Sequence, residues 1–255
     1  MAILSFVPAT AGAGFSPHRA VYDLQRLPGS DSTAFAQVSG RMVYQYDETC
    51  EGMTYSHRML LNLVTQQGES ITSETVVSFF ETLDGKTLRF SVRESNEGIV
   101  TSVREGSVRR TAPSVPADIT FDRLEGGGED TISKLPAGVM FPIGHSVDLT
   151  RAAEAGQAAH HATTFDGDSL SVVDSFIRSD TGSVEKAVPA EMKGMKAWIA
   201  RVAFYHPDSP DSAPYYETQM RLFANGLSGD FTMETGDLKA IARLVEVELH
   251  EKPSC

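Results

Sequence analysis

Cysteine, basic side chains and long apolar runs are all scarce in this chain of 255 residues. Its two cysteines are too few for an all-cysteine zinc site or a typical iron–sulfur cluster. No segment reaches the roughly 18 apolar residues of a membrane-spanning helix, so we expect no membrane span. The 22 Lys and Arg are outnumbered by 34 Asp and Glu, and the net charge of -12 repels phosphate groups. Nucleic acid and anionic lipid headgroups are therefore not expected partners.

The remaining composition is ordinary for a globular protein, with 41% apolar and 22% charged residues. It argues against a disordered or fibrous chain. At about 150 residues per domain the length corresponds to roughly 1.7 domains, but β sandwiches and barrels often form one domain of this size. We expect residues 16–255 to form a single domain.

Residues 1–15 resemble the end of a secretory signal peptide. The segment carries no charged side chain, Ala2–Val7 is a short apolar stretch, and small residues precede plausible cleavage sites near Ala11 or Ala13. The basic start of a signal is missing, so Met1 is expected to be a misplaced start or an artificial boundary of the chain. The alternative is a disordered N-terminus. We favour export, and the lack of a following cysteine argues against a lipid anchor at this end.

From about residue 18 onward, apolar and polar residues alternate, which is typical of half-buried strands. Residues 19–24 and 41–46 each place their apolar and aromatic side chains on one face. Gln66–Glu69 is expected to link two long strands as a hairpin. Asp84-Gly85 between two strand patterns predicts a tight type I′ turn. A series of strands with short turns predicts an antiparallel meander and not a βαβ fold.

The middle of the chain departs from this pattern. Gly126–Gly128 and Leu135–Gly138 predict loops, and Pro142–Gly156 suits one short helix with proline at its start and glycine at its end. Residues 239–248 fit either a helix or a strand, and we favour a strand because the segment is rich in Val and Leu. The predicted fold class is mainly β, with about a dozen antiparallel strands and one short packed helix.

No catalytic motif occurs in the sequence. It lacks the phosphate-binding GxxxxGK[ST] and the GxSxG of hydrolases, which Gly144-His145-Ser146 only approximates without a preceding strand. A nucleophilic cysteine is not expected, because an exported thiol with a potential partner is usually oxidised. The carboxylates are too numerous to single out a glycosidase pair. We therefore predict no catalytic residue and no enzyme.

The seven histidines show no metal-binding spacing. His160 and His161 are adjacent on a predicted strand, so their side chains point to opposite faces and do not easily share a metal. Each of the others is isolated, and a lone histidine is more often a surface or strand-end residue than a ligand. These are His18, His57, His145, His206 and His250. The run Asp166–Ser169 faintly resembles a calcium loop, but turn chemistry explains it better. We predict no metal site and no cofactor.

Trp198 and the methionines leave open whether the protein binds a ligand. Trp198 shares a strand face with Ala200 and Val202, which favours a core position. The alternative is an apolar groove for an amphipathic ligand. Methionine adapts to either environment. The methionines concerned are Met42, Met53, Met59, Met140, Met192, Met195, Met220 and Met233.

Cys50 and Cys255 lie far apart in the chain, and Cys255 is the last residue. In an oxidising compartment, a bond between them would tie the C-terminus to the strands near Cys50. Chain entropy limits the resulting stabilisation to roughly 5 kcal/mol. Two cysteines in an exported chain favour this bond over two free thiols.

Several segments carry a resemblance to a known family. Ser16–Leu24 (SPHRAVYDL) is followed by Gly40–Tyr44 (GRMVY) and Cys50–Thr54 (CEGMT). The further matching segments are Glu81–Gly85, Arg89-Phe90, Phe165–Asp168, Leu222–Leu227, Gly236–Leu238 and the terminal Cys255. Over essentially the whole mature chain, the sequence resembles the EipB family of alphaproteobacterial periplasmic proteins, long described only as a domain of unknown function.

The resemblance implies a β-spiral, in which antiparallel strands form a curled, broken barrel with one helix packed against it. It implies a disulfide between Cys50 and Cys255, a periplasmic location and a role in maintaining the cell envelope under stress. The family shape is similar to that of periplasmic lipoprotein carriers, which bind acyl chains.

We therefore expect a non-catalytic protein that binds an amphipathic ligand, such as a lipid, or an envelope protein on a concave β surface. The alternatives are an adaptor that engages partners through a sheet edge and, less favoured, a hydrolase of an envelope polymer.

Overall fold

The computed structural model describes residues 15–30, 34–126, 132–181, 189–209 and 213–255. All described strands belong to one sheet, in the spatial order β8-β7-β6-β5-β4-β3-β2-β1-β14-β13-β12-β11-β10-β9. The strands are β1 (His18–Arg26), β2 (Phe35–Glu48), β3 (Gly52–Thr65), β4 (Ser70–Thr82), β5 (Thr87–Asn96), β6 (Ile99–Arg109), β7 (Ala117–Glu125), β8 (Lys134–Leu135), β9 (Ala159–Phe165), β10 (Leu170–Ser179), β11 (Ala197–Tyr205), β12 (Tyr216–Phe223), β13 (Ser228–Thr235) and β14 (Leu238–Leu249). The helix α1 spans Pro142–Glu154, and Ala190–Met192 forms one turn of 3₁₀ helix.

The sheet consists of two meanders joined side by side. The first runs from β1 to β8, and the second runs from β9 back to β14, which pairs antiparallel with β1 from His18↔Leu249 to Arg26↔Ala240. The predicted mainly β, antiparallel class is confirmed, with fourteen strands in the described part of the chain where about a dozen were expected. Residues 239–248, which were ambiguous, lie within strand β14.

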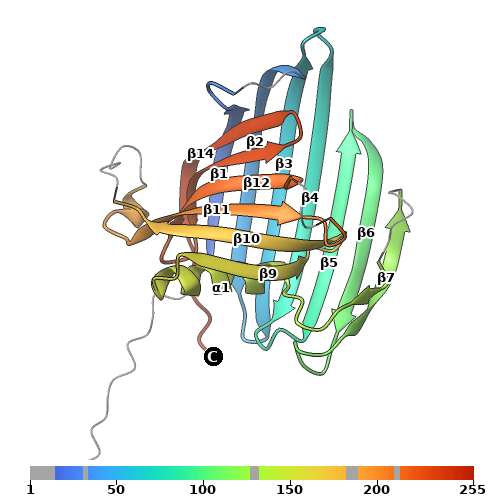
Figure 1. Ribbon diagram of the computed structural model, residues 1–255, viewed down its shortest axis with the longest axis vertical. Coiled ribbons are helices and arrows are strands. Elements are labelled where there is room, and N and C mark those ends of the chain that lie inside the picture. Colours follow the sequence, from blue (N-terminus) through green and yellow to red (C-terminus); the bar gives the residue numbers. More distant parts are fainter. Residues whose placement is uncertain (1–14, 31–33, 127–131, 182–188, 210–212) are drawn as a thin grey trace, which may run out of the picture.

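The sheet curls until its two ends meet, as a nearly closed barrel. Figure 1 shows β9–β12 (yellow to orange) crossing β1–β4 (blue to teal) at a steep angle. At the closure Phe165, the last residue of β9, packs against Phe90 of β5, and Arg104 of β6 pairs with Asp168. Strands β7 and β8 continue beyond this contact in the sheet order, so the sheet forms a spiral with overlapping ends.

The alternating pattern builds the inner face as predicted from the sequence. Ala20, Tyr22 and Leu24 are buried, with exposed fractions of 0%, 0% and 3%. Charged side chains of the outer face form cross-strand ion pairs, such as Arg41 with Asp23. These pairs are solvent-exposed and contribute little stability, so burial of the inner face drives the curl.

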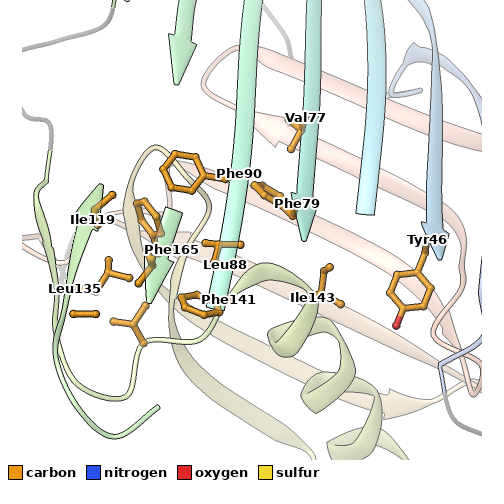
Figure 2. Packing of buried hydrophobic residues seen from close by; sticks show 13 residues of the cluster. Tyr46, Val77, Phe79, Leu88, Phe90, Ile119, Leu135, Phe141, Ile143 and Phe165 are labelled. Atoms are coloured by element: carbon orange, nitrogen blue, oxygen red, sulfur yellow. The ribbon is translucent and has the colours of Figure 1, made fainter. Parts of the chain in front are cut away.

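The core divides into clusters along the interior. Figure 2 shows one of them, where Leu88, Phe90 and Phe165 lie close to Phe141, just before α1. In a second cluster Trp198 packs with residues of α1 and is only 2% exposed, so its predicted core position is confirmed.

Helix α1 closes one end of the spiral and bears out the predicted helix. Pro142 occupies its first turn, and Gly156 with φ 74° follows its last turn. Leu149 and Ala153 pack against the second meander. Over the described part of the chain, we find no helix with the length and hydrophobicity of a membrane span.

The connection between β4 and β5 differs from the prediction. The prediction of a type I′ turn is wrong. The loop has four residues, and only Gly85 among them takes a positive φ, of 65°. Asp84 Oδ1 instead accepts hydrogen bonds from Thr82 Oγ1 and the Lys86 amide, and so stabilises the longer loop. The Gln66–Glu69 connection does link β3 and β4 as a hairpin.

The predicted signal remnant, residues 1–15, lies outside the described residues except for Phe15. The Phe15 ring packs edge-on against Tyr46, with centroids 4.6 Å apart, and the Ser16 amide donates to the Asn225 carbonyl.

Candidate functional site

An aromatic row crosses the inner face of the sheet. It consists of Phe231 (β13), Tyr22 (β1), Tyr44 (β2), Tyr55 (β3) and Phe79 (β4). Successive ring centroids are 5.0, 5.7, 5.8 and 5.9 Å apart. From β1 to β4 the row exists because every second side chain of a strand points inward and meets the corresponding side chain of the next strand. Phe231 reaches Tyr22 across β14, which lies between β13 and β1.

The middle of the row retains contact with solvent. Tyr22 and Phe79 are buried, whereas Tyr44 and Tyr55 are only partly buried. Met59 lies two residues after His57 on β3 and is also partly buried. The same is true of its cross-strand partner Thr75 on β4. Part of the inner face therefore remains accessible to solvent.

The second meander forms the opposite wall of this concave face. Phe204 of β11 and Tyr216 of β12 lie 5.4 Å apart between ring centroids, and both are partly buried. Tyr216 adds a small electrostatic contribution to the raised pKa of Tyr55, which is caused mainly by burial. Met220 adds an adaptable apolar side chain on the same wall.

Three polar side chains of the inner face, Tyr55, Tyr216 and His57, are uncharged at neutral pH. Burial among the strands raises the pKa of Tyr55 and raises that of Tyr216 to about 12, so both phenols keep their protons. Burial lowers the pKa of His57 to about 4, which leaves its imidazole neutral. His57 Nδ1 lies 2.9 Å from the Tyr55 hydroxyl, and His18 Nε2 lies 3.0 Å from the Tyr44 hydroxyl.

Glu81 is the buried carboxylate at the α1 end of the interior. It is 2% exposed, and its two oxygens accept hydrogen bonds from the Ile143 amide (2.5 Å) and the Gly144 amide (2.8 Å). Burial raises the pKa of Glu81 to about 7, although these bonds and Arg110 favour the anion. Its geometry is that of a cap on the first turn of α1.

Cys50 and Cys255 form a disulfide, with sulfur atoms 2.00 Å apart and Cα atoms 5.6 Å apart. Neighbouring contacts hold the same tail: His250 Nδ1 lies 2.7 Å from Asp47 Oδ1, and the His250 amide donates to the Pro17 carbonyl. Both cysteines are exposed. The disulfide borders an open depression of about 530 Å³, whose lining side chains are of mixed charge.

For His57 and His145, the structure corrects the expectation that lone histidines lie on the surface or at strand ends, whereas His18, His206 and His250 do lie at strand ends. His145, on α1, is only 7% exposed, and burial lowers its pKa to about 4. His57 lies within β3 and faces the interior. The sequence reveals neither position, because burial depends on how the sheet curls. His206 stacks on Tyr215, with ring centroids 4.5 Å apart.

The other candidate segments have structural roles. Asp166 Oδ1 accepts hydrogen bonds from the Asp168 and Ser169 amides, so the predicted turn is confirmed. Ser146 donates to the Pro142 carbonyl within α1, which is not the geometry of an activated nucleophile. Across the described residues, His, Cys, Asp and Glu do not gather in threes or more as metal ligands.

The curled sheet and its concave, aromatic-lined inner face define a barrel-like, all-β protein. The chain belongs to the EipB-like family, whose model matches residues 9–251. It is 27% identical over 252 residues to the cell envelope integrity protein EipB of Brucella abortus, covering 95% of this chain and 87% of the relative. The fold is similar to the crystal structure of a β-barrel-like protein of a domain of unknown function, DUF1849, also from Brucella abortus. The TM-score is 0.78 at 23% identity, over 94% of this chain and 100% of the other.

Proposed function

We propose that the chain is an exported, periplasmic and non-catalytic protein that supports cell-envelope integrity and resistance to envelope stress. It does so by binding an amphipathic ligand, such as a lipid, or an apolar segment of an envelope protein on its concave inner face. The name of the Brucella relative supports the envelope role. The exposed disulfide supports an oxidising compartment, since such bonds are rarely maintained in the cytosol.

The observation that carries the binding proposal is the partly buried inner face with its neutral phenol and imidazole groups. The aromatic row offers broad apolar contacts, and Met59 and Met220 can adjust to an irregular ligand. An acyl chain gains about 0.8 kcal/mol for each buried CH₂ group. Hydroxyl and imidazole groups such as those of Tyr55 and His57 can hydrogen-bond a small polar group of the ligand.

The non-catalytic part of the proposal rests on the buried carboxylate. Both oxygens of Glu81 are occupied by amides at the start of α1, so this carboxylate acts within the fold.

A pair of tryptophan substitutions on β4 tests the binding proposal. Thr75→Trp fills the inner face beside Met59, whereas Ser78→Trp places the same side chain on the exposed outer face. Native mass spectrometry of protein purified from its own envelope should show a retained lipid for the wild type and Ser78→Trp, and not for Thr75→Trp. Displacement of a fluorescent fatty acid should follow the same order. No bound lipid and no fatty-acid uptake by the wild type would refute ligand binding.

The adaptor alternative has weaker support. Beyond Asp118, the edge of β7 has no strand partner among the described residues. This edge carries Asp122, Arg123 and Glu125, all exposed. Charged side chains on a sheet edge disfavour the addition of another strand.

A further inference from the structure

A cluster of buried polar groups lies where α1 packs against β9 and β10. Three of its atoms have no hydrogen-bond partner among the described residues: His145 Nε2, His160 Nδ1 and Ser175 Oγ. His145 is 7% exposed, the His160 side chain 8% and Ser175 1%. Each unsatisfied buried polar atom destabilises the folded state. Three such atoms in one cluster therefore indicate that an ion or a water molecule binds there.

The geometry brings the two imidazoles together. Their ring centroids are 5.5 Å apart, with an interplanar angle of 47°. Ser175 stands directly opposite His160 in the β9–β10 register, and therefore on the same face. Two histidines that are 15 positions apart in the chain thus form a pair only because α1 docks on the edge strand β9.

Asp148 fixes the orientation of one ring. His160 Nε2 lies 2.9 Å from Asp148 Oδ2, so Nε2 carries the proton that it donates to the carboxylate. Nδ1 of His160 is then left with a free lone pair directed away from Asp148. A carboxylate that holds the far nitrogen of an imidazole is the usual outer partner of a metal-binding histidine.

We propose that His145 Nε2 and His160 Nδ1 together bind one divalent transition-metal ion of the zinc or copper kind, with water completing the coordination. Imidazole nitrogens suit these ions, and bonds of about 2.0–2.1 Å to a shared tetrahedral ion place two ring centres on the order of 5 Å apart. A site with two protein ligands agrees with the lack of any larger ligand cluster in the described ranges. The ion links α1 to β9 and so strengthens the closed end of the spiral.

The test uses the full chain, stripped of metal with EDTA and titrated with zinc chloride in a calorimeter. We expect one zinc ion per chain and a melting temperature that rises by roughly 5–10 °C when zinc is 100-fold above its Kd. His145→Ala and His160→Ala should each weaken binding at least tenfold. His161→Ala is the matched control, because His161 is one residue away on the exposed face of β9, and it should bind zinc like the wild type.

A measurement on the unsubstituted protein covers the case that a variant fails to fold. In nitrogen-15 NMR of the histidine side chains, zinc should shift Nε2 of one buried histidine and Nδ1 of the other. A cluster that holds only a bridging water would show no zinc-dependent change and no calorimetric binding, which overturns the proposal. Zinc binding that persists in His145→Ala, or that disappears in His161→Ala, also overturns it.

Discussion

Phe165 of β9 packs edge-on against Phe90 of β5, with ring centroids 5.6 Å apart and an interplanar angle of 88°. The two strands are separated by most of the sheet order, so they meet only because the sheet curls back on itself. Both rings are buried, at 0% and 4% exposure. This pair therefore marks the contact that closes the spiral.

Replacing the Phe165 ring should lower the stability of the fold. We expect Phe165→Ala to lower the free energy of unfolding by about 3–5 kcal/mol, because it leaves a cavity in a packed cluster. Phe176→Ala is the matched control: Phe176 lies on the neighbouring strand β10 and is 63% exposed, so its loss should cost less than about 0.5 kcal/mol. Urea denaturation measures the free energy of unfolding of both variants. Equal effects would show that the closure contact is not important for stability.

The disulfide should stabilise the protein by constraining a very long loop. Cys50→Ser and Cys255→Ser should each lower the free energy of unfolding by up to about 5 kcal/mol, and the double variant should lose no more than either single one. Non-reducing mass spectrometry of a digest should show one peptide pair that joins the two cysteines. Two free thiols in the native protein would contradict this prediction.

Glu81 should make stability fall as the pH rises. Burial raises its pKa in the folded protein from 4.5 to about 7. Between these values the folded state holds a proton that the unfolded chain has released, so the contribution of this group is present below about pH 4.5 and is lost as the pH rises through about 7. The shift corresponds to about 3 kcal/mol.

Denaturation with urea at about pH 5 and about pH 8 checks this expectation. The difference in the free energy of unfolding between wild type and Glu81→Gln should change with pH in the direction given above. Glu94→Gln, which alters an exposed carboxylate of β5, should leave the pH dependence of the wild type intact. If Glu81→Gln also leaves the pH dependence of the wild type intact, then Glu81 does not hold an extra proton in the folded protein.

His57 should have the opposite effect to Glu81 and make stability fall as the pH falls. Burial lowers its pKa in the folded protein from 6.5 to about 4, so the unfolded chain binds a proton first as the pH falls. Its contribution is present above about pH 6.5 and is lost as the pH falls through about 4, which corresponds to about 3 kcal/mol. His57→Gln should therefore lose less stability than the wild type between about pH 7 and pH 4. His161→Gln, on the exposed face of β9, is the control and should unfold in acid like the wild type.

Local patterns predicted most of the secondary structure. Alternation along His18–Arg26 and Phe35–Glu48 identified both the strands and the side chains that face inward, because the pleat of a strand has a period of two residues. Proline and glycine marked the start and end of α1 for equally local reasons. The prediction of a type I′ turn at Asp84-Gly85 was wrong, because the length of a hairpin loop also depends on the register of the strands that it joins.

The candidate sites could not be predicted in this way. The aromatic row combines Phe231 with Tyr22, which lie at opposite ends of the chain and meet only after β14 has paired with β1. His145 and His160 looked isolated, because their pairing depends on how α1 docks against β9. For the same reason, nothing in the sequence around Glu81 distinguishes it from the many exposed carboxylates.

By itself, the sequence determined most of the strands, the helix α1 and the inward-facing apolar residues of β1 and β2, since these follow from the period of the backbone and from residue chemistry. Only the tertiary structure decided which inward-facing groups meet, which of them stay partly exposed, and which histidines and carboxylates lose contact with water. The physical reason is that the curl of the sheet is a collective property: it brings together residues that no local pattern relates, and the burial that follows sets their pKa values and their unsatisfied hydrogen bonds.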